Sequence, residues 1–215
     1  EESIGYELGL RHRQDSVNAE LVAFFTDFDN LIATDNGFGE DNTNRNVGEA
    51  EVYGIEGVIS YDAGADCGLT FGVPMYLSAT WTTAELTEDI AEGGGDGIYD
   101  GGMDGSEIPY VPEWKIAAGI GLAFESWGTN LDITYTSSTF GTANNFDEPV
   151  DNQIQGKIDE AFLVDLSAYY QVNENFRLVG GFHNLLDEEF ISSRVPLGAR
   201  AGAPRSLYGG FEWTF

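Results

Sequence analysis

The sequence predicts an all-β, antiparallel transmembrane β-barrel, and three observations lead to that fold class. First, apolar residues alternate with small or polar residues along most of the chain, and no segment shows convincing helical periodicity. Second, several alternating stretches exceed ten residues. Strands of soluble proteins usually have about five or six residues, whereas a tilted membrane strand needs about 9–11. Third, short and long connections alternate, as they do in outer-membrane barrels.

Nine stretches carry the alternation. In the clearest ones, every second residue is apolar: 4–11, 69–82, 114–125 and 207–215. Weaker alternation occupies roughly 17–33, 50–62, 129–137, 161–171 and 176–184. Because successive side chains of a strand point to opposite faces, each stretch should present one apolar and one more polar face.

The two faces can be predicted residue by residue. The apolar residues expected to face lipid are Ile4, Leu21, Phe71, Leu77, Ile120, Ile133, Leu166 and Phe211. The acidic residues expected on the opposite, interior side are Glu7, Glu20, Glu56, Asp132, Asp165 and Glu212. A β-sandwich would also hide one face of each sheet. The long strands, the alternating connections and a polar face rich in Gly, Ser and Thr favour the barrel.

The connections predict an orientation and an incomplete barrel. The tight ones read "HRQDS", "DAGADCG", "ESWG" and "VNEN", and long polar ones lie roughly at 34–46, 84–109, 138–160 and 185–204. Single-chain bacterial barrels have an even number of strands, and an open sheet edge in lipid leaves unpaired backbone groups that cost several kcal/mol each. We therefore expect residues 1–215 to be the C-terminal part of a larger barrel.

Charge disfavours one class of partner. The chain has 37 acidic and 9 basic residues, a net charge of −28, whereas nucleic-acid binding needs clustered Lys and Arg. Acidic residues without a cation fill the connection 84–109: Glu85, Glu88, Asp89, Glu92, Asp96, Asp100, Asp104 and Glu107. A solvated surface loop is the favoured interpretation. Divalent-cation binding is the alternative, although "GGGDGIYDGGMDG" fits neither the EF-hand nor the nonapeptide repeat.

The sequence offers no support for catalysis. It contains no nucleophile elbow, HExxH motif or P-loop. The single Cys67, in a short turn, cannot form an internal disulfide, and His12 and His183 do not suggest a shared site. Neither an enzyme nor a cofactor is therefore expected.

One motif carries a family resemblance. The stretch "HNLLDEEF" (183–190) follows a strand and precedes a long connection. It resembles the C-terminal signature of TonB-dependent outer-membrane receptors. Asn184, Leu185, Asp187 and Phe190 match that signature, whereas Leu186 stands where Phe is usual. Other agreeing stretches are "AELVAFFTDFDNLI", "GEAEVYGIEG", "IPYVPEWK" and "FLVDLSAYYQVNENFRL".

The closing stretch "SRVPLGARAGAPRSLYGGFEWTF" is similar to the end of receptors in the ferric-dicitrate branch of that family. The resemblance implies a barrel of about 22 strands with a plugged lumen, of which this chain would be the last nine strands. It also implies the outer membrane of a Gram-negative bacterium, with import of a ferric siderophore or ferric citrate energised through TonB. Phe211, Trp213 and Phe215 would form the aromatic end that the barrel-assembly machinery reads.

The Arg and Lys residues of the long connections are candidate ligand contacts. If the last strand runs to the periplasm, the long connections lie outside the cell, and with them Arg45, Lys157, Arg194 and Arg200, with Arg205 near the top of that strand. An Arg guanidinium can bind a carboxylate of an anionic ferric chelate through paired hydrogen bonds. We therefore predict ligand contacts from Arg45, Asn44, Arg194 and Arg200, and no metal-ligand set. Alternatively, the arginines neutralise nearby acids or contact lipopolysaccharide.

The sequence is also compatible with other functions. The same fold could import another solute, such as a cobalamin, another metal chelate or a glycan, because fold does not determine ligand. A passive porin or adhesin barrel and a soluble Ca²⁺-dependent β-sandwich are the alternatives from other classes. If the protein imports a ferric chelate, its expected partners are the chelate, the TonB complex, outer-membrane lipid with lipopolysaccharide, and the assembly machinery.

Overall fold

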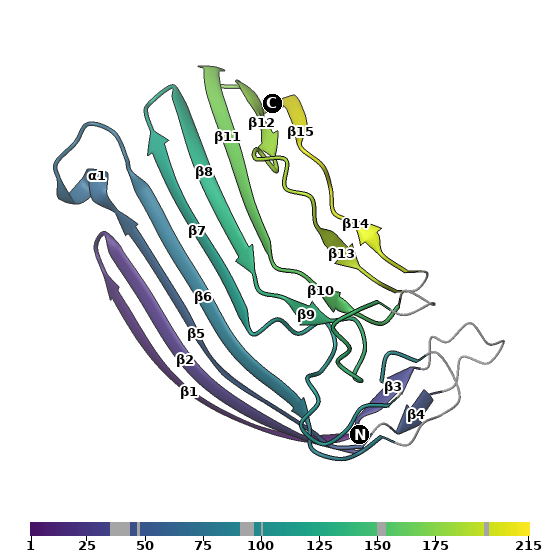
Figure 1. Cartoon of the computed structure of the whole chain (residues 1–215). Coiled ribbons are helices and arrows are strands. Elements are labelled where there is room, and N and C mark those ends of the chain that lie inside the picture. Colours follow the sequence, from purple (N-terminus) through teal and green to yellow (C-terminus); the bar gives the residue numbers. More distant parts are fainter. Residues whose placement is uncertain (35–43, 47, 91–96, 100, 150–153, 196–197) are drawn as a thin grey trace.

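A computed structural model describes residues 1–34, 44–46, 48–90, 97–99, 101–149, 154–195 and 198–215 (Figure 1). Its main feature is one antiparallel sheet of nine strands in the order β1-β2-β5-β6-β7-β8-β11-β12-β15. The strands are β1 (Glu2–Gln14), β2 (Val17–Asp29), β5 (Ala50–Asp62), β6 (Pro74–Leu86), β7 (Trp114–Ala123), β8 (Trp127–Thr136), β11 (Ala161–Asn173), β12 (Phe176–His183) and β15 (Ser206–Trp213). The predicted number of strands and their antiparallel order are confirmed.

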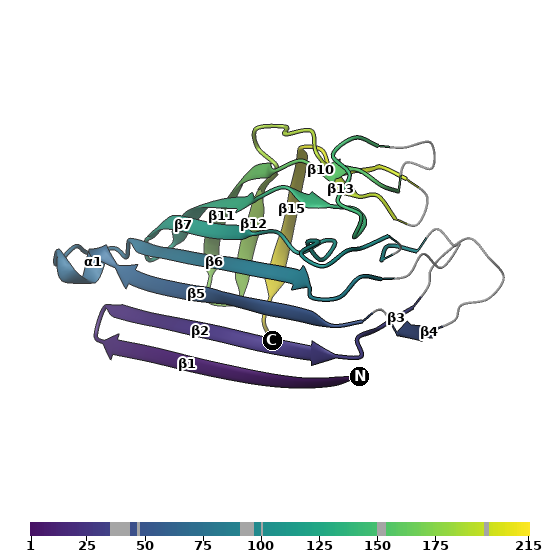
Figure 2. The same ribbon diagram turned by 60° about the horizontal axis from the view of Figure 1, so that its bottom comes forward.

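The sheet is open within the described residues. Strand β1 pairs only with β2, and β15 pairs only with β12. The sheet is also strongly curved and twisted, so that β12 and β15 run steeply across the direction of β1 in Figure 2. No helix in the described part of the chain is long and apolar enough to cross a membrane.

The two ends of the sheet differ as predicted. Three of the four short connections are tight turns, and the fourth contains the helical turn α1 (Ala63–Asp66). The long connections carry small ribbons: β3 (Ile32–Thr34) with β4 (Asn44–Asn46), β9 (Thr139–Phe140) with β10 (Lys157–Ile158), and β13 (Ile191–Ser193) with β14 (Arg200–Ala201). These ribbons lie at one end of the sheet, here the loop end, and α1 lies at the other, the turn end (Figure 2).

The strand register confirms the two predicted faces, because directly opposed residues share a face. The residues on one face, called the apolar face, include Ile4, Leu21, Leu77, Ile120, Ile133, Leu166 and Phe211. The residues on the other, called the polar face, include Glu7, Glu20, Glu56, Asp132, Asp165 and Glu212.

The prediction that Phe71 lies on the lipid-facing side of a strand was wrong, because Phe71 lies outside the nine strands. The alternation predicts a strand from residue 69, but β6 begins at Pro74. Asp62 explains the difference: its Oδ1 accepts hydrogen bonds from the Gly64 and Val73 amides, both at 2.9 Å, and so stabilises a helical turn. Phe71 instead stacks on Phe124, with ring centroids 4.5 Å apart.

The apolar face is exposed, and the buried core lies elsewhere. Leu8 is 76% exposed and Leu207 72%, as suits a surface that meets lipid chains. The buried apolar cluster is small and consists of Ala50, Ala84, Leu86, Ile90, Ile108 and Ala143. Its strand residues belong to the polar face. The long connections therefore fold over the polar face at the loop end and bury their own apolar residues there.

Candidate functional site

Arg194 joins three of the long connections. It lies between β13 and β14 and is only 6% exposed. Its backbone amide donates to Tyr110 Oη at 3.1 Å, and its Nε and Nη2 donate to the Lys157 carbonyl oxygen at 3.0 and 2.8 Å. Tyr110 belongs to the β6–β7 connection and Lys157 to the β8–β11 connection. These three residues, here the Arg194 hub, fix the relative positions of the connections.

Local backbone geometry supports the hub. Tyr110 has a φ of 64°, an uncommon value for a residue with a side chain, and its amide donates to the Phe140 carbonyl at 3.1 Å. The Lys157 ammonium lies 5.7 Å from the centroid of the Phe140 ring. Gly141 allows close approach, since a Cβ there would be 2.5 Å from the Ile154 carbonyl oxygen and 3.1 Å from Arg194 Cδ.

A cavity of about 250 Å³ lies beside the hub and is called the loop cavity. Strands β8 and β11 contribute their polar face, and the three connections joined by Arg194 supply the remainder. The lining residues are Tyr110, Pro112, Thr134, Thr136, Ser137, Thr139, Ile158, Asp159, Ala161, Leu163, Phe190, Ile191 and Ser192. Hydroxyl and apolar groups dominate this set, and Asp159 is its one charged member.

The motif at residues 183–190 has a structural role. Asn184, 4% exposed with a φ of 49°, donates its amide to Asp165 Oδ1 at 2.8 Å. Its side chain donates to the Glu188 and Ala203 carbonyls and accepts from the Glu188 amide. Asp187 accepts from the Arg205 amide at 3.0 Å. Asn184 and Asp187 therefore stabilise the turn after β12 and also fasten the far end of the connection before β15.

A row of polar side chains crosses the polar face. Tyr76 Oη donates to Asp132 Oδ1 at 2.7 Å, and Asp132 lies directly opposite Asp165 on the next strand. His183 Nδ1 lies 3.2 Å from Asp165 Oδ2. Gly119 lies between Tyr76 and Asp132, where a Cβ would be 2.2 Å from Tyr76 Cε1. The sequence alone does not place Tyr76 and His183 in one row, because only the register shows that they align.

The predicted ligand residues differ in burial and in hydrogen bonding. Arg194 is buried and bonded to a carbonyl, so its position is that of a residue that holds loops together. Arg200 lies exposed in β14, and Arg205 is paired with Asp187 at 3.5 Å. Neither Arg194 nor Arg200 lines the loop cavity. Arg45 and Asn44 belong to β4, opposite Ala33 and Thr34 in the backbone register, and their side chains lie outside what the structure describes.

The acidic β6–β7 connection shows one perturbed group. Partial desolvation raises the pKa of the Glu107 carboxyl above its usual value, and nearby Glu113 and Glu85 act in the same direction. Within the described residues, no group of three or more His, Cys, Asp and Glu side chains could hold a metal ion. Glu92, Asp96 and Asp100, which contributed to the divalent-cation alternative, lie outside the described residues.

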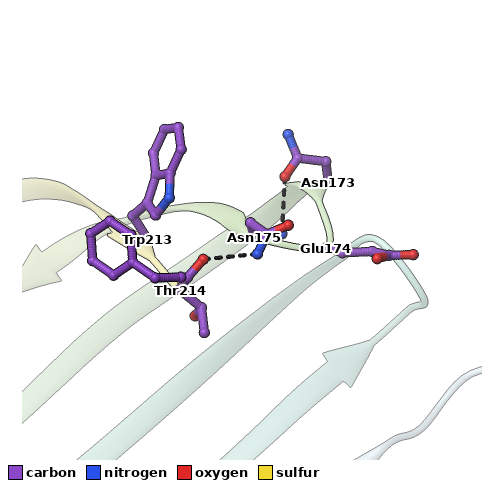
Figure 3. A pocket seen from close by; sticks show the side chains of 6 residues that line it. Asn173, Glu174, Asn175, Trp213 and Thr214 are labelled. Carbon is purple, nitrogen blue, oxygen red and sulfur yellow. Dashed lines mark hydrogen bonds between the residues drawn. The ribbon is translucent and has the colours of Figure 1, made fainter.

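The predicted assembly signal lies at the turn end. Phe211 and Trp213 share the apolar face and lie 5.7 and 5.5 Å from the ring of Phe176. Strand β15 ends at Trp213, so the expectation that Phe215 continues the strand was wrong. The chain turns to pair with Asn175 instead: Thr214 donates its amide to the Asn175 carbonyl at 3.0 Å, and Asn175 Nδ2 returns a bond to the Thr214 carbonyl at 2.8 Å (Figure 3).

Comparisons with known proteins agree on one family. The family model described as TonB dependent receptor-like, beta-barrel matches residues 1–185. The vitamin B12 transporter BtuB of Photobacterium profundum is 25% identical over 203 residues, covering 91% of this chain and 28% of the relative.

Solved structures have the same fold. The unliganded ferric citrate transporter FecA matches with a TM-score of 0.78 at 23% identity, over 98% of this chain and 31% of that one. The ferric yersiniabactin uptake receptor FyuA from Yersinia pestis gives 0.77 at 17% identity, over 99% of this chain and 30% of that one. The chain thus spans less than a third of the length of these relatives.

Proposed function

Because this chain belongs to the TonB-dependent receptor-like β-barrel family, we propose that it forms part of an outer-membrane receptor that imports a scarce solute with energy relayed through TonB. The family match over residues 1–185 carries this proposal. The exposed apolar face supports a position in the outer membrane of a Gram-negative bacterium.

The open edges support a second part of the proposal. In a membrane, β1 and β15 each need a further strand to satisfy their outer backbone groups. We assign residues 1–215 to the C-terminal part of the barrel, with the plug, the TonB-contacting box and the other strands supplied by further parts of the receptor. Partners of this chain are then the barrel-assembly machinery, outer-membrane lipid and lipopolysaccharide.

The proposed solute is an anionic iron chelate, either a ferric siderophore or ferric citrate. Two of the solved structures with this fold are a ferric citrate transporter and a ferric yersiniabactin receptor. Arg200 supports the proposal from this chain, because it is exposed on a loop-end ribbon and can form paired hydrogen bonds with a carboxylate. We propose that Arg200, Arg45 and Asn44 contact the chelate, and that Arg194 acts through the connections it joins.

Cobalamin is the second candidate solute. The observation that favours it is the relative from Photobacterium profundum, a vitamin B12 transporter that covers 91% of this chain at 25% identity. Cobalamin carries far less negative charge than ferric citrate, so its capture should depend little on Arg200. The two candidates therefore make different predictions for one substitution.

The test is solute binding to the purified full-length receptor. We expect ferric citrate or a carboxylate siderophore to bind the wild type, and Arg200→Ala to weaken binding about ten- to a hundredfold, the cost of one charge-assisted contact. Arg200→Lys keeps the charge and should lose less, and Arg205→Ala, whose partner is Asp187, serves as the matched control. Binding of cobalamin without any ferric chelate would replace the first candidate with the second.

A further inference from the structure

We propose that the loop cavity binds a neutral polyhydroxylated ring, of the kind found in sugars. This inference is independent of which solute the receptor imports, because the cavity has a lining unlike that expected for an anionic chelate. It rests on the described residues that surround the cavity.

The charge of the lining excludes an anionic occupant. Asp159 is the only ionisable acid or base at physiological pH among the lining residues, and no Lys, Arg or His belongs to the set. An anion would meet the Asp159 carboxylate with no cation in the lining, in a chain with a net charge of −28. A neutral ligand with hydroxyl donors meets no such penalty, because a carboxylate accepts strong hydrogen bonds from them.

Two hydroxyl groups are free to receive such a ligand. Ser137, Thr139 and Ser192 already bond to backbone groups. The side-chain hydroxyls of Thr134 and Thr136, by contrast, make no hydrogen bond to the described residues, and neither does the Asp159 carboxylate. The two threonines lie on the same face of β8, about 6.6 Å apart along the strand. Their hydroxyls can therefore reach different positions around one ring.

Phe190 supplies an apolar wall. Its ring packs so closely on Gly202 that a Cβ there would lie 2.1 Å from the ring, and Gly202 donates its amide to the Phe190 carbonyl at 2.7 Å. The ring is thus held in place while it also lines the cavity. An aromatic ring suits the apolar C–H face of a sugar, while the threonine and aspartate groups suit its hydroxyls.

The size of the cavity limits the occupant. A volume of about 250 Å³ lies just below the usual range for ligand pockets, about 300–1,000 Å³. It suits a single ring and not a whole metal chelate. The ring can come from a free saccharide or from the sugar core of lipopolysaccharide, since both present the same chemistry at the loop end.

The experiment measures sugar binding to the purified full-length receptor by saturation-transfer NMR and calorimetry. The probes are glucose, galactose and mannose, the anionic sugar glucuronate, and purified core oligosaccharide from lipopolysaccharide. We expect at least one neutral sugar or the core oligosaccharide to bind more tightly than glucuronate. Thr136→Val and Asp159→Asn should each weaken that binding about tenfold, as expected for one hydrogen bond.

Two controls make the result decisive. Thr80→Val makes the same chemical change on the polar face of β6, outside the cavity, and should leave sugar binding unchanged. Ferric chelate binding is measured on every variant, so that a failure of the import proposal is seen separately. Binding of free sugar alone or of core oligosaccharide alone supports the site and identifies its source. The proposal is overturned if neither a neutral sugar nor the core oligosaccharide binds, or if both cavity variants bind sugar as well as the wild type.

Discussion

Arg194 donates two guanidinium hydrogen bonds to a single carbonyl oxygen, that of Lys157, across 37 residues of sequence. A buried guanidinium in this position cannot leave its carbonyl without losing both bonds. The guanidinium therefore holds two connections together at the loop end, and the ligand contact predicted for Arg194 stays a prediction.

The first prediction separates these two roles. Arg194→Lys keeps the positive charge but cannot reproduce the paired donation, so it should loosen the connections nearly as much as Arg194→Ala does. Hydrogen exchange of the Tyr110 and Lys157 regions in the full-length receptor checks this. If Arg194→Lys keeps wild-type protection and ligand affinity, then the positive charge of Arg194 is sufficient, and its paired hydrogen bonds are not needed to hold the connections.

The second prediction concerns Asn184. Its side chain makes three hydrogen bonds, so Asn184→Ala should lower the free energy of unfolding by about 1–3 kcal/mol. Asn184→Gly loses the same three hydrogen bonds, but glycine adopts the positive φ without strain. It should therefore be less destabilising than Asn184→Ala, by the strain that alanine meets at this φ. Denaturant unfolding in lipid vesicles measures both variants. Equal stability of wild type and Asn184→Ala would remove the structural role assigned to this motif.

The third prediction uses Gly119. A Cβ at this position would lie 2.2 Å from Tyr76 Cε1, so Gly119→Ala should displace that ring and break the bond between Tyr76 and Asp132. The same substitution in a Tyr76→Ala background should be less damaging, because the closest clash is gone and only the 2.8 Å approach to Asp132 Oδ1 remains. A double-mutant cycle of unfolding free energies tests this. Additive effects would show that Tyr76 and Gly119 are not coupled.

The fourth prediction concerns the end of the chain. Phe215 is fully exposed and contributes little burial to the folded sheet. Phe215→Asp should therefore lower the amount of receptor assembled in the outer membrane while leaving solute affinity of the assembled receptor unchanged. Phe215→Tyr keeps an aromatic ring and serves as the control. Normal outer-membrane levels of Phe215→Asp would rule out a role in assembly.

Alternation was enough to predict the sheet because each strand has one exposed apolar face and one polar face, a pattern visible without tertiary contacts. It failed at Phe71, where a capping carboxylate 9 residues earlier in the chain creates a helical turn. The position of Arg194 could not be predicted either. Its burial depends on Tyr110 and Lys157, which reach it only after three connections fold together.

Uptake by whole cells tests the central claim most directly. Cells that produce the full-length receptor and lack other iron-chelate receptors are given radiolabelled ferric citrate and carboxylate siderophores, with and without a functional TonB complex. We predict accumulation that disappears when TonB is removed and that Arg200→Ala reduces. Uptake that continues unchanged without TonB would contradict energised import and would point to a passive barrel.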